Sequence, residues 1–173
     1  MQAQAKQISI ASEVINEIEA EAEITNRLFD ILPEDKLSWR PHPKAKTLGE
    51  LAMHIAVIPG NVTSIAIEDT HEFAGIPKDP DVTSREQIKS EFARSLEQAK
   101  QILRSTDVEA AHREVKLVLN GKTVFAAPRK SFWRTVLLNH NYHHRGQLST
   151  YLRELDIPLP SIYGPSADTN PFA

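Results

Sequence analysis

The chain contains no cysteine among its 173 residues. Disulfide bonds and thiolate metal ligands are therefore excluded, and any bound metal must be held by nitrogen or oxygen atoms. Glycine is also scarce, with six residues, which favours helices over a turn-rich β-sandwich. Because cysteine is absent, the clustering of histidines becomes more informative.

The sequence also lacks a basic stripe and a long apolar run. Its formal net charge is −3, whereas nucleic-acid-binding domains usually carry clustered lysine and arginine, so we expect no nucleic-acid partner. No run approaches the ~18 apolar residues of a membrane span, and the first residues lack the apolar core of a signal peptide. We therefore expect a cytoplasmic protein without a membrane partner.

What is present is the pattern of a helical protein. The apolar fraction of 40% and charged fraction of 25% are typical of a soluble globular protein, and the length suits one domain. Apolar residues recur at steps of three and four in four long segments, as expected for amphipathic helices, at approximately 8–32, 48–65, 83–103 and 131–154. The sequence predicts a single all-α domain over residues 1–173.

Two short motifs indicate where helices begin. Thr47 with Glu50, and Thr83 with Glu86, have the Ser/Thr-x-x-Glu form of a capping box, in which side chains satisfy the first free backbone N–H groups. Pro59 should kink or locally open the second helix. We therefore expect helix starts near Leu48 and after Thr83.

The first helix carries an acidic run, Glu17, Glu19, Glu21 and Glu23. Such a run could form a cation site built from carboxylates. Alternate residues of a helix point in different directions, however, so we interpret the run as a solvated outer face.

One short element interrupts the helical pattern between the third and fourth helices. The Asn120-Gly121 pair lies between apolar residues and predicts a β-hairpin over Val115–Phe125, with an irregular loop as the alternative. A two-residue loop would place Leu117 opposite Val124. The proline- and glycine-containing stretch 71–81 is interpreted as a loop.

Three of the seven histidines, His140, His143 and His144, lie within five residues. In a helix, His140 and His144 are one turn apart on the same face, whereas His143 points about 100° away from His144. His54 lies on the apolar face of the second helix and could complete the set. Three imidazoles can bind a metal and leave a position open for water or substrate. The alternative is that each is a core histidine that bonds a polar neighbour.

The sequence lacks the motifs of several other enzyme classes. A zinc peptidase helix places glutamate directly after its first histidine, but here that residue is Asn141. There is also no Gly-x-Ser-x-Gly nucleophile motif and no glycine-rich phosphate loop.

Two segments together resemble the signatures of the DinB/YfiT-like metalloenzyme family. They are Trp39-Arg40-Pro41-His42-Pro43 leading to Thr47-Leu48-Gly49-Glu50-Leu51-Ala52-Met53-His54, and His140-Asn141-Tyr142-His143-His144-Arg145-Gly146-Gln147-Leu148. The end of the chain, Tyr163–Asp168, is similar to the family's closing segment. The resemblance implies a four-helix bundle with up-down-down-up connectivity, a divalent metal bound by His54, His140 and His144, and often a homodimer.

The resemblance also implies the type of chemistry. We expect a metal-dependent hydrolase or thiol S-transferase that acts on a small molecule, such as a low-molecular-weight thiol, with Zn, Ni or Fe as the metal. Glu50, His143 and Gln147 are candidates for catalytic or ligand-orienting groups, although Glu50 could act only as a helix cap. The alternatives are a non-catalytic metal-binding or dimerisation protein and a plain bundle without metal.

Overall fold

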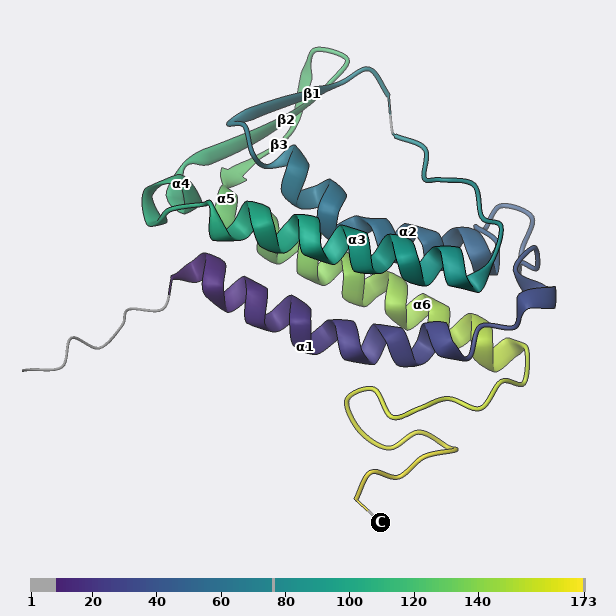
Figure 1. The fold of residues 1–173 in the computed structure, drawn as a ribbon. Helices are drawn as coiled ribbons and strands as arrows, with labels where there is room; N and C mark the ends of the chain where they lie inside the picture. The colour runs from purple at the N-terminus through teal and green to yellow at the C-terminus, as the bar shows by residue number, and fades with distance from the viewer. Residues whose placement is uncertain (1–8, 76, 173) are drawn as a thin grey trace, which may run out of the picture.

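The computed structural model describes residues 9–75 and 77–172. Four long helical segments lie side by side (Figure 1). The first and last run in one direction and the two between them in the other, so the all-α fold with up-down-down-up connectivity is confirmed. The segments are α1 (Ile10–Asp30), α2 (Leu48–Ile65), α3 (Arg85–Arg104), and the consecutive α5 (Arg129–Phe132), η2 (Trp133–Asn139) and α6 (His140–Glu154).

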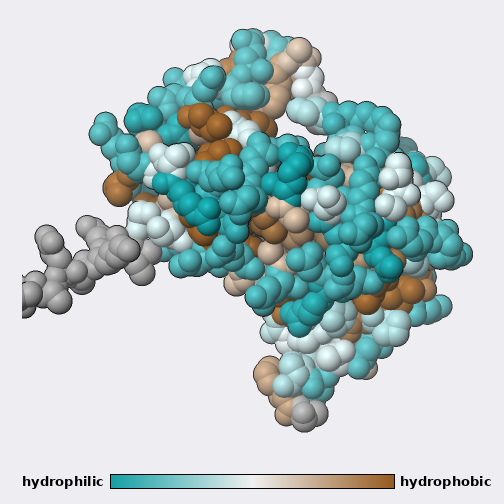
Figure 2. Space-filling model, in the orientation of Figure 1, coloured by the Kyte–Doolittle hydropathy of each residue, from teal (hydrophilic) through white to brown (hydrophobic). Residues whose placement is uncertain are grey.

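Apolar faces of these helices form the core. Phe29 of α1 meets Phe92 of α3 edge to face, with ring centroids 5.3 Å apart, and both side chains are buried. The face that α3 presents outward is mostly hydrophilic (Figure 2). Two short helices complete the connections, η1 (Glu34–Lys36) and α4 (Val108–His112). Over the residues that the structure describes, every helix is too short or too polar to span a membrane.

The capping box at the start of α2 is confirmed. The Thr47 hydroxyl accepts a hydrogen bond from the Glu50 N–H at 3.1 Å, and the Glu50 carboxylate accepts one from the Thr47 N–H at 2.7 Å. The helix continues through Pro59, whose missing N–H leaves the Ile55 carbonyl without a helical partner. The Asn141 amide of α6 donates to that carbonyl at 3.4 Å.

The predicted cap of α3 is wrong by one residue. Ser84 is the N-cap, and its hydroxyl accepts from the Gln87 N–H at 3.0 Å. The Gln87 side chain accepts from the Thr83 N–H at 2.7 Å. The cap therefore pairs Ser84 with Gln87 instead of Thr83 with Glu86, because two successive hydroxyl residues both have the chemistry of an N-cap.

A small sheet covers one end of the helices (Figure 1). Strands β2 (Glu114–Leu119) and β3 (Lys122–Pro128) form the predicted hairpin, and Asn120 and Gly121 have the positive φ values of 50° and 73° that its turn requires. The interpretation of 71–81 as a loop is partly wrong, because β1 (Thr70–Phe73) pairs in parallel with β2. The sheet order is β1-β2-β3.

The register of the hairpin also differs from the prediction. Leu117 lies opposite Phe125 and not Val124, because the ladder is interrupted between Leu117 and Val118. An extra residue at such an irregularity shifts all later pairs by one position.

The segment after α6 is ordered and returns along α1. Asp168 accepts hydrogen bonds from the Arg153 guanidinium and, at 2.8 Å, from the Leu159 N–H. The Tyr163 hydroxyl donates to Glu21 of α1 at 2.8 Å. These contacts fix the tail against the outer side of the helices.

Candidate metal centre

The structure brings His54 of α2 together with His140 and His144 of α6. The Nε2 atoms of His140 and His144 are 2.8 Å apart, and those of His54 and His140 are 3.4 Å apart. All three ligand atoms lie within 4.8 Å of one another, and all three side chains are half-buried. The cluster expected from the sequence is therefore present, with its Nε2 atoms pointing at a common centre.

Hydrogen bonds on the outer side of two rings define which nitrogen faces inward. His54 Nδ1 lies 2.8 Å from the Asp79 carboxylate, and His144 Nδ1 lies 2.7 Å from the Gln147 side-chain oxygen. Both oxygens are acceptors, so the Nδ1 atoms of His54 and His144 carry the protons and their Nε2 atoms present lone pairs. A neutral His140 can donate one hydrogen bond from Nε2, which leaves at least one inward lone pair unsatisfied.

The surroundings of His140 and His144 favour the neutral forms of these two imidazoles. Burial, together with the neighbouring His54, His140 and His143, lowers the pKa of His144 to about 4, although its hydrogen bond with Gln147 acts in the opposite direction. Burial and, to a smaller extent, the neighbouring His54 also lower the pKa of His140. Neutral imidazole is the form that binds metals. The surroundings of His140 and His144 therefore favour the metal-binding form of these side chains over the imidazolium ion.

An unusual helical turn precedes His140. Residues of η2 (Trp133–Asn139) form a π-helix between α5 and α6, where the sequence pattern predicted one continuous α-helix. A π-helical stretch changes the rotation per residue, and such stretches often occur at functional sites. The α-helical period alone could not predict it.

Asp79 is a site residue that the sequence pattern did not predict. It lies in the segment between β1 and α3, and besides His54 it contacts the Lys46 ammonium at 3.1 Å. Burial raises the pKa of the Asp79 carboxyl, but the hydrogen bonds and charges of His54 and Lys46 outweigh burial and lower it. A single aspartate in a proline-containing loop, 25 residues after its partner, has no spacing that would mark it.

The three residues expected to be catalytic or to orient ligands, Glu50, His143 and Gln147, differ in how they contact the three histidines. Glu50 is held by the capping box and lies 3.8 Å from the Arg40 guanidinium, so its carboxylate is occupied away from the three histidines. His143 is exposed, and its ring lies 4.9 Å from that of His144 without joining the converging Nε2 atoms. Gln147 contacts the cluster through His144.

An apolar pocket opens beside the cluster. His54 and His140 form part of its wall, and its volume is about 350 Å³. The sheet provides another wall through β1, β2 and β3, so the hairpin whose role the sequence left open helps to enclose the pocket. Two imidazoles and many apolar side chains thus line the same pocket.

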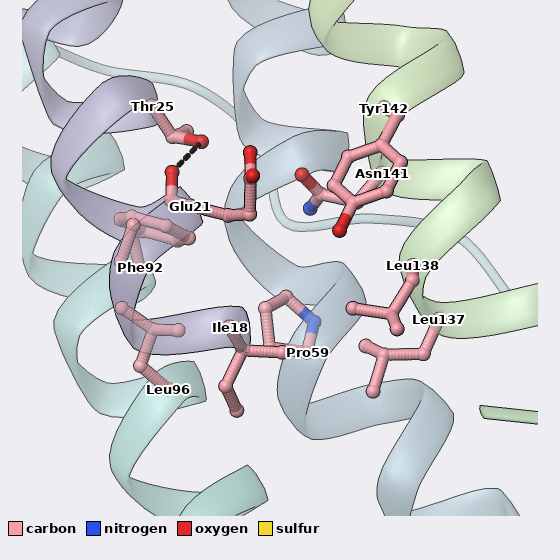
Figure 3. A pocket seen from close by; sticks show the side chains of 11 residues that line it. Ile18, Glu21, Thr25, Pro59, Phe92, Leu96, Leu137, Leu138, Asn141 and Tyr142 are labelled. Atoms are coloured by element: carbon pink, nitrogen blue, oxygen red, sulfur yellow. Dashed lines mark hydrogen bonds between the residues drawn. The ribbon is translucent and has the colours of Figure 1, made fainter. Parts of the chain in front are cut away.

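A second polar cluster lies on another face of α6, around the buried Arg145. Its guanidinium pairs with Glu21 of α1, donates to the Thr25 hydroxyl at 3.4 Å, and contacts Tyr163 of the tail. Glu21, Thr25 and Asn141 also border a cavity of about 20 Å³ between the helices (Figure 3). The interpretation of the acidic run as wholly solvated is therefore wrong for Glu21.

Comparisons with known proteins agree with this architecture. Residues 17–148 match the family model described as the DinB superfamily, a range that includes all three histidines. The chain is 26% identical over 153 residues to the uncharacterized protein YrdA of Bacillus subtilis (strain 168), covering 87% of this chain and 86% of YrdA.

Solved structures show the same fold. A DinB-like protein from Bacillus cereus ATCC 10987 has a TM-score of 0.64 at 25% identity, over 87% of this chain and 95% of that one. The DinB-like protein YjoA of Bacillus subtilis has a TM-score of 0.67 at 19% identity, over 87% and 96% of the two chains. The family match covers most of the sequence, and the chain belongs to the DinB superfamily.

Proposed function

We propose that this protein is a metal-dependent enzyme in which His54, His140 and His144 bind one divalent cation. The observation that carries the proposal is the convergence of three Nε2 atoms, at least one with an unsatisfied lone pair, beside a pocket. With Zn–N bonds of 2.0–2.1 Å, two nitrogens of a tetrahedral site lie roughly 3.3 Å apart. The 3.4 Å separation fits this value, and the 2.8 Å separation needs to open by only about 0.5 Å.

The reaction class we propose is hydrolysis of, or thiol transfer to, a small molecule. A divalent cation bound by three histidines would polarise an oxygen and lower the pKa of a bound water or thiol. Asp79 and Gln147 accept hydrogen bonds from the outer N–H groups of His54 and His144, which orients these rings and makes them stronger ligands. His143 is the exposed imidazole nearest the cluster and is the residue we propose to carry protons to and from solvent.

Metal analysis of protein purified without an affinity tag tests the proposal. Wild type should contain about one Zn, Ni or Fe ion per chain, since imidazole suits all three metals. His140→Ala should contain almost none, whereas His143→Ala, which removes the exposed imidazole of the same helix, should match wild type. Equally low metal content in wild type and His140→Ala after incubation with each metal would refute the metal site.

Activity assays then test the enzymatic part. Chelator-treated protein should lose turnover of ester or thiol-plus-electrophile substrates, and adding back the metal should restore it. A protein that binds metal at the three histidines but shows no metal-dependent turnover with either substrate class would support the non-catalytic alternative.

A further inference from the structure

We infer that the pocket beside the metal centre takes an uncharged apolar group of the substrate, such as an alkyl chain or an aromatic ring. The inference deepens the proposed function and rests on it for the position of the reacting atom. The relevant features are the composition of the pocket walls, the size of the pocket and the position of the two histidines in its wall.

The walls are apolar on the sides that α2, η2 and the sheet provide. Residues from all three contribute, including Ile58, Val62, Leu117, Leu119, Val124 and Val136. Val124 is 56% exposed, so an apolar ligand in the pocket would cover apolar surface that now contacts water.

The charges of the pocket argue against an anionic occupant. Among the described residues that line it, Asp79 is the one with a formal charge, and it is already paired with His54 and Lys46. Away from the three histidines and their proposed metal ion, a carboxylate or phosphate in the pocket would face no cationic side chain among the described residues that line it, and burying an unpaired charge is costly. A neutral apolar group meets no such penalty.

The size of the pocket limits the group. At about 350 Å³ it has roughly twice the volume of a cavity that holds benzene, which is about 150 Å³. A bicyclic aromatic group or a medium-length alkyl chain would therefore fit. Because His54 and His140 line the same pocket, such a group would leave an attached polar atom next to the three histidines.

Two probe series test the inference separately from the metal site. Acyl hydroxamic acids, from acetohydroxamic to octanohydroxamic acid, bind metals through the hydroxamate and extend an alkyl chain of increasing length. Primary alcohols from ethanol to octanol have no metal-chelating group and can be titrated into chelator-treated protein. In both series the dissociation constant should fall by about fourfold per methylene until the pocket is full.

Leu119→Glu and Val118→Glu provide a matched pair of variants in β2. Leu119 lines the pocket and Val118, the preceding residue of the strand, does not. Leu119→Glu should remove the chain-length dependence and leave acetohydroxamate affinity and metal content unchanged, whereas Val118→Glu should retain the wild-type dependence. Thermal unfolding measurements test whether each variant is folded. If Leu119→Glu is unfolded, Val124→Glu at the exposed rim replaces it, with Thr123→Glu as its control.

The outcomes separate the two ideas. Dissociation constants that do not change with chain length in both series would overturn the inference about the pocket. Chain-length dependence for the alcohols, with no metal bound and no hydroxamate binding, would support the apolar pocket and refute the proposed metal function.

Discussion

Two polar clusters occupy two faces of α6 and differ in how completely their groups are paired. His140 and His144 face α2, while Asn141 and Arg145, each one residue further along, face the interior between α1 and α2. Arg145 meets an acid, a hydroxyl and a backbone carbonyl. The three histidines instead direct their Nε2 atoms at one another, and at least one of the lone pairs on these atoms has no hydrogen-bond donor. A complete polar cluster stabilises the fold, whereas an incomplete one leaves binding capacity for a ligand.

Removing Arg145 should have the largest effect on stability. Arg145→Met leaves Glu21 beside an apolar side chain, and breaking a buried ion pair in this way costs roughly 3–5 kcal/mol of unfolding free energy. His140→Ala, measured with chelator present, should change the unfolding free energy by less than about 1 kcal/mol, because it removes a half-buried imidazole whose Nδ1 has no hydrogen-bond partner among the described residues. Urea unfolding followed by circular dichroism gives both values.

A double variant provides the control for charge. Glu21→Gln combined with Arg145→Met removes both charges and should recover part of the lost stability. If the double variant is as unstable as Arg145→Met alone, the packing of Arg145 and not its ion pair stabilises this face of α6. Equal losses for Arg145→Met and metal-free His140→Ala would contradict the distinction between the clusters.

The second largest effect we expect is a loss of metal affinity when the hydrogen bond that orients His54 is weakened. Asp79→Asn weakens the acceptor for His54 Nδ1, so the metal affinity should fall by about 10–100-fold with the fold intact. Asp81→Asn is the matched control, because Asp81 lies in the same loop and pairs with the exposed Lys78. Competition titration with a chromogenic chelator measures the affinities. An affinity for Asp79→Asn equal to that of Asp81→Asn would remove Asp79 from the site.

Features defined by local chemistry could be predicted from the sequence. The Thr47–Glu50 cap, the Asn120-Gly121 turn and the one-turn spacing of His140 and His144 each involve only a few consecutive residues. Their geometry follows from backbone donors, positive φ angles and the helical period.

Features that join distant segments could not be predicted in the same way. Strand β1 was interpreted as loop because its partner, β2, lies more than forty residues away and pairs with it in parallel. Glu21 was assigned to a solvated face because a helical period cannot show that Arg145, on the last helix, is buried against it. Asp79 was missed for the same reason. Such partners depend on which elements pack together, and this is a property of the whole fold.

The smallest effect we expect is in the tail that covers the Arg145 side. The Arg153 guanidinium and the Leu159 N–H lower the pKa of Asp168, so the ionised carboxylate stabilises the tail at pH values above 3.8, the ordinary pKa of an aspartate. That stabilisation is lost as the pH falls through the lowered folded-state pKa, because the protonated group no longer pairs with Arg153.

Asp168→Asn should reproduce the loss at neutral pH. Hydrogen exchange of residues 157–168 should accelerate in this variant and stay at the wild-type rate in Asp156→Asn, while the exchange of α6 and the metal content remain unchanged in both. Exchange in the Asp168→Asn tail as slow as in wild type would show that the apolar contacts of Ile157, Leu159 and Ile162 are sufficient to hold the tail in place.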